Sequence, residues 1–187
     1  MHDFLDALNH PADAFRRQNR SLAWGFVAAT ILVVTILDPL LGLWINGFQR
    51  AVFSANTLRL ILCGIASYAA MCAGLYLVCR ALGSTTPFKV FLNTWGLTYL
   101  PTLACAIVVG FVENLFFLFW GNALLGMAVN LLFGGVLIWK TILYIIFLRD
   151  VAGLRKKQFW AAFIACGALV LILAFANMAL GLKTPVL

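Results

Sequence analysis

Five long apolar segments fill most of this chain, and the basic residues gather in every second gap between them. The segments cover residues 22–45, 58–78, 91–112, 123–148 and 159–182. Each can cross a bilayer as a helix, because a hydrocarbon core of ~30 Å takes about 20 residues at a rise of about 1.5 Å per residue. Charged residues make up only 10% of the 187, against about 25% in soluble domains. The pattern predicts an all-α membrane protein, a bundle of five transmembrane helices.

The break between the third and fourth segments rests on a few polar residues. Glu113 is the only formal charge between Leu97 and Ile138, and Asn114, Gly121 and Asn122 are polar or weaken a helix. We place the break there and expect a short aromatic turn over residues 115–120, although four or six spans remain open. The first segment exceeds the 7–15 apolar residues of a signal peptide and is expected to be a retained span.

The basic residues predict an orientation, because Lys and Arg in short loops stay on the cytoplasmic side. Nine lie on one side of the five-span arrangement and three on the other. The nine are Arg16, Arg17, Arg20, Arg80, Lys89, Arg149, Arg155, Lys156 and Lys157, and the three are Arg50, Arg59 and Lys183. We expect a cytoplasmic N-terminus, an outside C-terminus, and loops that contact anionic lipid headgroups. Nucleic acid is not expected as a partner, and the short N-terminal region suggests a bacterial inner membrane.

Residues 1–21 are too short for a domain and are expected to form an interfacial amphipathic helix on the cytoplasmic leaflet, ahead of one transmembrane domain over 22–187. Pro11 can open a short helix that points Phe15 to one side and Arg16 and Arg17 to the other. A dedicated partner-binding arm is the alternative.

Catalytic and metal-binding patterns are absent from the sequence. The five cysteines form no CxxC pair, both histidines precede the first span, and no phosphate loop, GxSxG or HExxH motif occurs. Asp38 and Glu113 could supply a carboxylate pair, but both are expected near the outer ends of their helices. We therefore expect no enzyme activity, cofactor or metal.

Lys140 is the one cation that the loop pattern does not explain, because it lies inside the fourth segment. A charge in the membrane is costly and is by default a functional candidate. Its ammonium could snorkel to the cytoplasmic headgroups or serve a polar role inside the bundle. Asp38 is too far along the bundle axis for a direct ion pair, and Pro39 should end or kink the first helix near the outer surface.

Small and polar residues within the spans predict helix packing. Ala66, Ala70 and Gly74 recur every four residues, which lets helices approach closely within one chain or between copies. Asn130 and Asn177 could form hydrogen bonds between helices, and Pro101 should kink the third span unless neighbours satisfy the freed carbonyl.

Residues 80–103 read RALGSTTPFKVFLNTWGLTYLPTL, and residues 11–17 read PADAFRR. With the five-span plan, these segments make the chain resemble the Ypt-interacting-protein (Yip) domain family, particularly its short bacterial members. The resemblance draws attention to Pro11, Phe15, Gly83, Pro87, Tyr99 and Pro101 as architectural residues. Eukaryotic relatives engage small GTPases and partner Yip proteins. This chain has no long region before the first span and lacks the Asp-Leu-Tyr-Gly-Pro motif, which speaks against GTPase binding.

These observations favour a non-enzymatic membrane scaffold or adaptor that organises membrane proteins or lipids, alone or as a homo-oligomer. One alternative is a small transporter or channel in which Lys140, Asp38, Asn130 and Glu113 line a polar route. The other is an accessory subunit of a larger membrane complex, which would share the sequence features of the scaffold.

Overall fold

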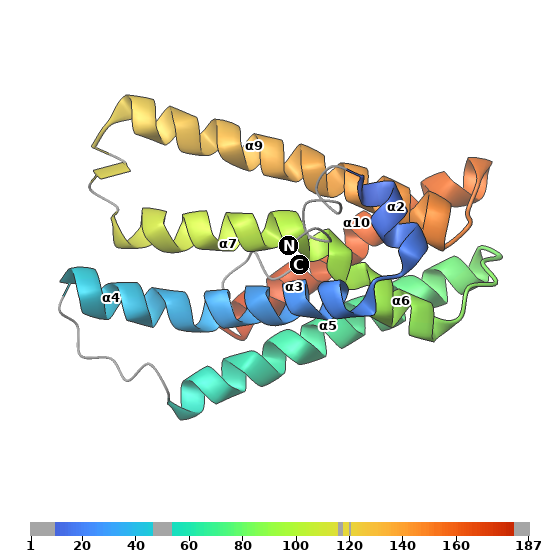
Figure 1. The fold of residues 1–187 in the computed structure, drawn as a ribbon, viewed down its shortest axis with the longest axis horizontal. Coiled ribbons are helices and arrows are strands. Elements are labelled where there is room, and N and C mark those ends of the chain that lie inside the picture. The colour runs from blue at the N-terminus through green and yellow to red at the C-terminus, as the bar shows by residue number, and fades with distance from the viewer. Residues whose placement is uncertain (1–9, 47–53, 116–117, 120, 182–187) are drawn as a thin grey trace.

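The fold is known from a computed structural model, which describes residues 10–46, 54–115, 118–119 and 121–181. The described residues are almost all helical and contain no strand. Long antiparallel helices run side by side, and short helices lie at one end (Figure 1). The elements are α2 (Pro11–Arg17), α3 (Arg20–Leu32), the π-helix η1 (Val33–Leu37), α4 (Asp38–Asn46), α5 (Ala55–Ala81), α6 (Phe88–Thr94), the 3-10 helix η2 (Trp95–Thr98), α7 (Tyr99–Asn114), α9 (Ala123–Ile146), the π-helix η3 (Phe147–Val151) and α10 (Lys156–Ala179).

Within the described residues, five stretches of helix are long and apolar enough to cross a membrane, which confirms the predicted fold class. They are Arg20–Leu37, Ala55–Ala81, Phe88–Asn114, Ala123–Val151 and Lys156–Ala179. The break between the third and fourth is also where it was predicted. Asn122 caps the start of α9, since its side chain accepts a hydrogen bond from the Leu124 amide at 3.0 Å.

The first span contains a local irregularity at the proline. Of the two outcomes expected at Pro39, an end or a kink, the helix does not end there, because it continues through α4 to Asn46. The wider π-turn η1 directly precedes Asp38 and Pro39. A proline cannot donate to the carbonyl four residues earlier and its ring crowds that carbonyl. A π-turn at this position re-routes the helical hydrogen bonds, a common way for a helix to absorb such a break.

The third span accommodates Pro101 in a different way, by a change of helix type just before it. This span changes from α6 to the 3-10 turn η2 and then to α7, so Pro101 falls in the first turn of α7. Amides in a first turn have no acceptor within the helix, and a missing N–H there costs little. Thr98 donates its hydroxyl to the Trp95 carbonyl at 2.8 Å and satisfies one of the acceptors near this change.

The third span is the centre of the bundle. About three-fifths of its most apolar stretch is buried (61%), against 11% for the span formed by α10. The elements that contact it come from either side, with α3 against η2 and α7, α4 against α7, α5 against α6, and α9 against α7. Residues on this span are therefore in the best position to hold the other helices together.

The two ends of the bundle differ in charge. We call the end formed by α2, the α5–α6 turn and the α9–α10 turn the basic end, and the other the opposite end (Figure 1). The basic end carries all nine of the Lys and Arg residues that the sequence placed on one side. Of the N-terminal region, residues 10–21 are described, and α2 packs against η3 and α9. Phe15 is fully buried and packs edge-on against Phe147 with ring centroids 6.0 Å apart.

Candidate functional site

The basic end is built on a cluster of aromatic rings from the third span, the fourth span and α2. Trp95 stacks on Tyr144 with centroids 5.0 Å apart and meets Phe147 edge-on at 4.9 Å. Phe91 meets Phe147 at 5.3 Å, and Phe15 covers the same ring from α2. Edge-on and stacked pairs of this kind stabilise beyond the area that they bury. The cluster therefore fixes α2, η2 and η3 relative to one another.

Gly96 lets α3 and η2 touch backbone to backbone. A Cβ atom at this position would overlap the Ala23 carbonyl oxygen and lie 2.7 Å from its carbon and 2.9 Å from Val27 Cγ2. A side chain is therefore excluded unless one of the two backbones moves. Sequence reasoning missed Gly96, although a glycine between Trp95 and Leu97 in an aromatic stretch is the kind of signal that marks a close approach.

Two turns at the basic end are joined by side-chain hydrogen bonds. Gly83 takes a left-handed φ of +96° at the end of α5, which its lack of a side chain allows. The chain then places Ser84 and Thr86 against the α9–α10 turn. Ser84 donates its hydroxyl to the Ala152 carbonyl at 2.7 Å, and Thr86 donates to the Val151 carbonyl at 2.8 Å. Pro87 follows in extended conformation and caps α6.

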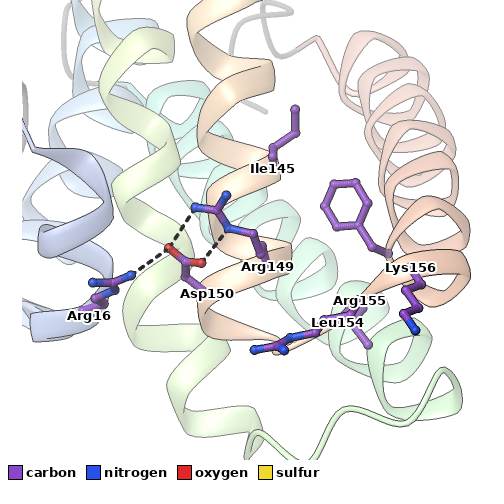
Figure 2. Close-up of a pocket in the computed structure, with 8 residues that line it drawn as sticks. Arg16, Ile145, Arg149, Asp150, Leu154, Arg155 and Lys156 are labelled. Atoms are coloured by element: carbon purple, nitrogen blue, oxygen red, sulfur yellow. Dashed lines mark hydrogen bonds and ion pairs between the residues drawn. The ribbon is translucent and has the colours of Figure 1, made fainter.

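An ion cluster ties α2 to the same region (Figure 2). Asp150 accepts a hydrogen bond from Arg149 Nε at 2.8 Å, and Arg16 Nη2 of α2 lies 3.9 Å from its other carboxylate oxygen. The Asp150 side chain is largely buried, whereas both arginine side chains are mainly exposed. The carboxylate thus orients two cations that still face solvent.

The Lys140 ammonium points into the bundle, toward α7. Its ammonium donates to the Thr102 hydroxyl of α7 at 2.7 Å and lies 5.9 Å from the centre of the Tyr144 ring. Of the two placements expected for Lys140, the structure has the one in the bundle interior. Through Tyr144 the cation is connected to the aromatic cluster, since Tyr144 stacks on Trp95.

Tyr99 is buried beside a second tyrosine. Its ring meets Tyr68 edge-on at 5.5 Å, and the Tyr68 hydroxyl donates to the Leu92 carbonyl at 2.7 Å. Among the side chains that the structure describes, the Tyr99 hydroxyl is the one fully buried polar group without a hydrogen-bond partner. A buried hydroxyl without a partner lowers the free energy of unfolding. The Tyr99 hydroxyl is therefore expected to destabilise the fold.

The remaining predicted polar residues do not gather around Lys140. Glu113 is exposed in the last turn of α7, and Asn130 is exposed on α9. Asp38 begins α4, but its side chain lies outside the described part of the structure. Within that part, no three His, Cys, Asp or Glu side chains are grouped so that they could hold a metal. Asn177 does bond between helices, with its amide donating to Ser67 at 3.0 Å.

The small-residue stripe on α5 is partly covered by another helix. Ala66 and Ala70 are exposed, whereas Gly74 lies against α10, with Leu169 about 3.2 Å from where its Cβ would be. Packing of the two alanines between copies of the chain stays a prediction. The face of α5 that is buried runs one position later and carries Gly64, Ser67, Tyr68, Met71, Cys72, Leu75 and Cys79.

The chain matches a known protein family. The family model of the Yip1 domain matches residues 5–178, which is nearly the whole chain and all five spans. No curated protein and no solved structure matches the chain.

Proposed function

The chain belongs to the Yip1 domain family, and from this membership we propose that it is a non-enzymatic membrane scaffold whose basic end binds other membrane proteins. The spans would hold the protein in the bilayer, and the basic end would present the binding surface. By the charge rule for short loops, the basic end faces the cytoplasm, and we assign the protein to the bacterial inner membrane.

The docking of the two turns is the observation that carries this proposal. Ser84 and Thr86 fix the α5–α6 turn on the α9–α10 turn, and Phe15 and Arg16 fix α2 beside them. Three segments far apart in sequence thus form one ordered surface. An ordered surface binds a partner with less loss of conformational entropy than three mobile loops would, and binding residues are often carried on loops that a rigid scaffold positions.

The test is to change exposed charges of this surface and compare the proteins that crosslink to it. Lys89 and Lys157 are exposed at the basic end, and the double variant K89E/K157E should fold as the wild type does. We expect it to lose a defined set of partners in crosslinking from native membranes followed by mass spectrometry. The matched control is R59E, an exposed position at the opposite end, which should keep the set. An unchanged set in K89E/K157E would contradict the scaffold proposal.

Transport is a second candidate, which the position of Lys140 favours. A cation held between α7 and α9 by Thr102 is placed where a polar route through the bundle would need it. Substitution K140M removes the charge and keeps much of the volume. If the protein transports ions or solutes in liposomes, K140M should reduce the rate; equal rates would count against transport. A role as an accessory subunit shares the features of the scaffold, and crosslinking to one fixed complex would identify it.

A further inference from the structure

A basic pocket opens between the end of the fourth span and the start of the fifth, beside α2. Its volume is about 550 Å³, which is enough for a lipid headgroup and the adjoining glycerol. Four cationic side chains line it, Arg16, Arg149, Arg155 and Lys156, and they come from α2, from η3, and from the α9–α10 turn with the start of α10 (Figure 2). The pocket therefore exists only when these three segments are docked together.

The charge of the pocket is unbalanced. The pocket is lined by four cations and by one carboxylate, that of Asp150. Its side chain is only 11% exposed, whereas those of Arg16 and Arg149, which it contacts, are 67% and 59% exposed. Arg155 and Lys156 have no ion-pair partner among the residues that the structure describes. A guanidinium carries five N–H donors, so donors remain for an anion after Asp150 has been satisfied.

The start of α10 adds to this positive field. Arg155 occupies the capping position, no described side chain caps the helix, and its first turn contains no acidic residue. The first amides of a helix have no acceptor within it, and they carry a partial positive charge. Free amides and cationic side chains thus converge on one pocket.

Apolar side chains line the part of the pocket that points toward the middle of the spans. Ile145 lies about one turn before Arg149 on α9, and Phe159 lies about one turn into α10 from Arg155. Figure 2 shows Ile145 on one side of Arg149. Arg155 and Lys156 lie on the other side. The charged groups are therefore at the end of the spans, and the apolar groups are deeper in the membrane.

We infer that this pocket binds an anionic phospholipid, with its phosphate on Arg149, Arg155, Lys156 and the start of α10, and its acyl chains along Ile145 and Phe159. A bidentate guanidinium matches the oxygens of a phosphate. The order of charged and apolar lining follows the order of headgroup and acyl chain in a leaflet. A soluble anion would gain nothing from the apolar residues, which is why a lipid is the better occupant. The inference concerns a lipid site and does not depend on the scaffold proposal.

The experiment measures lipid retention by the purified full-length protein in detergent, using native mass spectrometry. Phosphatidylglycerol is the anionic probe, and phosphatidylcholine and glycerol 3-phosphate are the comparison ligands. The variant is R155Q/K156Q, which removes two cations of the pocket. The control is K89Q/K157Q, which removes two exposed cations of the same end that do not line the pocket. Both lower the net charge equally, and neither residue pair has an ion-pair partner in the described chain.

We expect the wild type to retain one phosphatidylglycerol in preference to phosphatidylcholine. R155Q/K156Q should bind it about 25-fold more weakly, since each basic residue beside an anionic lipid contributes about fivefold, and K89Q/K157Q should stay within about twofold of the wild type. The single variant R155Q should lie between them. Equal losses in the two double variants, equal retention of phosphatidylcholine, or displacement by glycerol 3-phosphate alone would each overturn the inference.

Discussion

The two ends of the fourth span, which α9 and η3 form together, have similar composition and opposite surroundings. In the first half of α9, Leu124 and Leu131 are 73% and 72% exposed, and none of the residues from Ala123 to Trp139 is buried. At the other end of the same span, Leu143, Phe147 and Leu148 are at most 2% exposed. Both halves are apolar all round, so hydrophobicity alone does not distinguish them.

The difference shows where this bundle holds together. Packing is concentrated toward the basic end, where rings from α2, α6, η2 and η3 meet and two turns are bonded to each other. The first half of α9 shows its apolar side chains to the outside, as a helix facing lipid does. Lipid tails solvate leucine as well as another leucine does, so membrane helices associate through close packing and hydrogen bonds. Stability should therefore depend strongly on the basic end and weakly on the exposed half of α9.

The largest effect should come from Phe147, whose ring contacts Phe15, Phe91 and Trp95. Phe147→Ala leaves a cavity among three rings and should lower the free energy of unfolding by about 3 kcal/mol. Thermal unfolding in detergent, followed by aggregation or by tryptophan fluorescence, measures the loss. Leu131→Ala, in the exposed half of the same helix, should leave the midpoint almost unchanged. Equal effects of the two substitutions would remove the contrast between the halves.

A pair of glycine substitutions tests the same contrast through close approach. Gly96→Ala forces a methyl group into the Ala23 backbone and should destabilise by about 2 kcal/mol, as overpacking typically does. Gly134→Ala is the matched change in the first half of α9, where nothing lies within 4 Å of the added atom. It should be neutral or slightly stabilising, since alanine favours helix more than glycine does. The same assay applies, and a Gly96→Ala protein as stable as the wild type would show that α3 and η2 are not in contact.

The bonds between the two turns should have a smaller effect. The double variant S84A/T86V removes both hydroxyl donors and should lower stability by about 2 kcal/mol at most, at about 1 kcal/mol for each bond. The larger effect of this variant should be faster exchange of the backbone amide hydrogens at residues 82–87 and 152–155. Thr85→Val, an exposed neighbour, should leave exchange unaltered. Slow exchange in S84A/T86V would mean that the aromatic cluster alone fixes the turns.

The smallest effect should come from Asn177, which joins α10 to α5 through Ser67. A double-mutant cycle with Asn177→Leu and Ser67→Ala should give a coupling of about 0.6 kcal/mol, the average for hydrogen bonds between helices in membranes. Asn130→Leu provides the comparison, because Asn130 is exposed on the first half of α9. That substitution should stabilise slightly or have no effect. A coupling near zero at Asn177 would leave α5 and α10 held by packing alone.

Sequence reasoning was most successful where one residue type has one physical consequence. Asn122 caps the start of the fourth span, and Gly83 turns the chain after α5. It left open whether Pro39 ends or kinks the first helix, and the structure has a π-turn through which the helix continues. It also left open whether Ala66 and Ala70 pack within one chain or between copies, and both residues are exposed in the single chain. Lys140 could be recognised as unusual, but its partner Thr102 lies on another span. No local pattern in the chain connects those two positions.

The sequence alone therefore determined the spans, the break at residues 113–122 and the gathering of basic residues at one end. These follow from the thickness of a bilayer and the cost of placing charge in it, which act on each segment separately. The tertiary structure decided which apolar faces are buried, how Gly96 and Phe147 join the spans, and that Arg16, Arg149 and Arg155 line one pocket. The reason is that residues facing lipid and residues facing the core are equally apolar in a membrane protein, so hydrophobic pattern carries no information about burial.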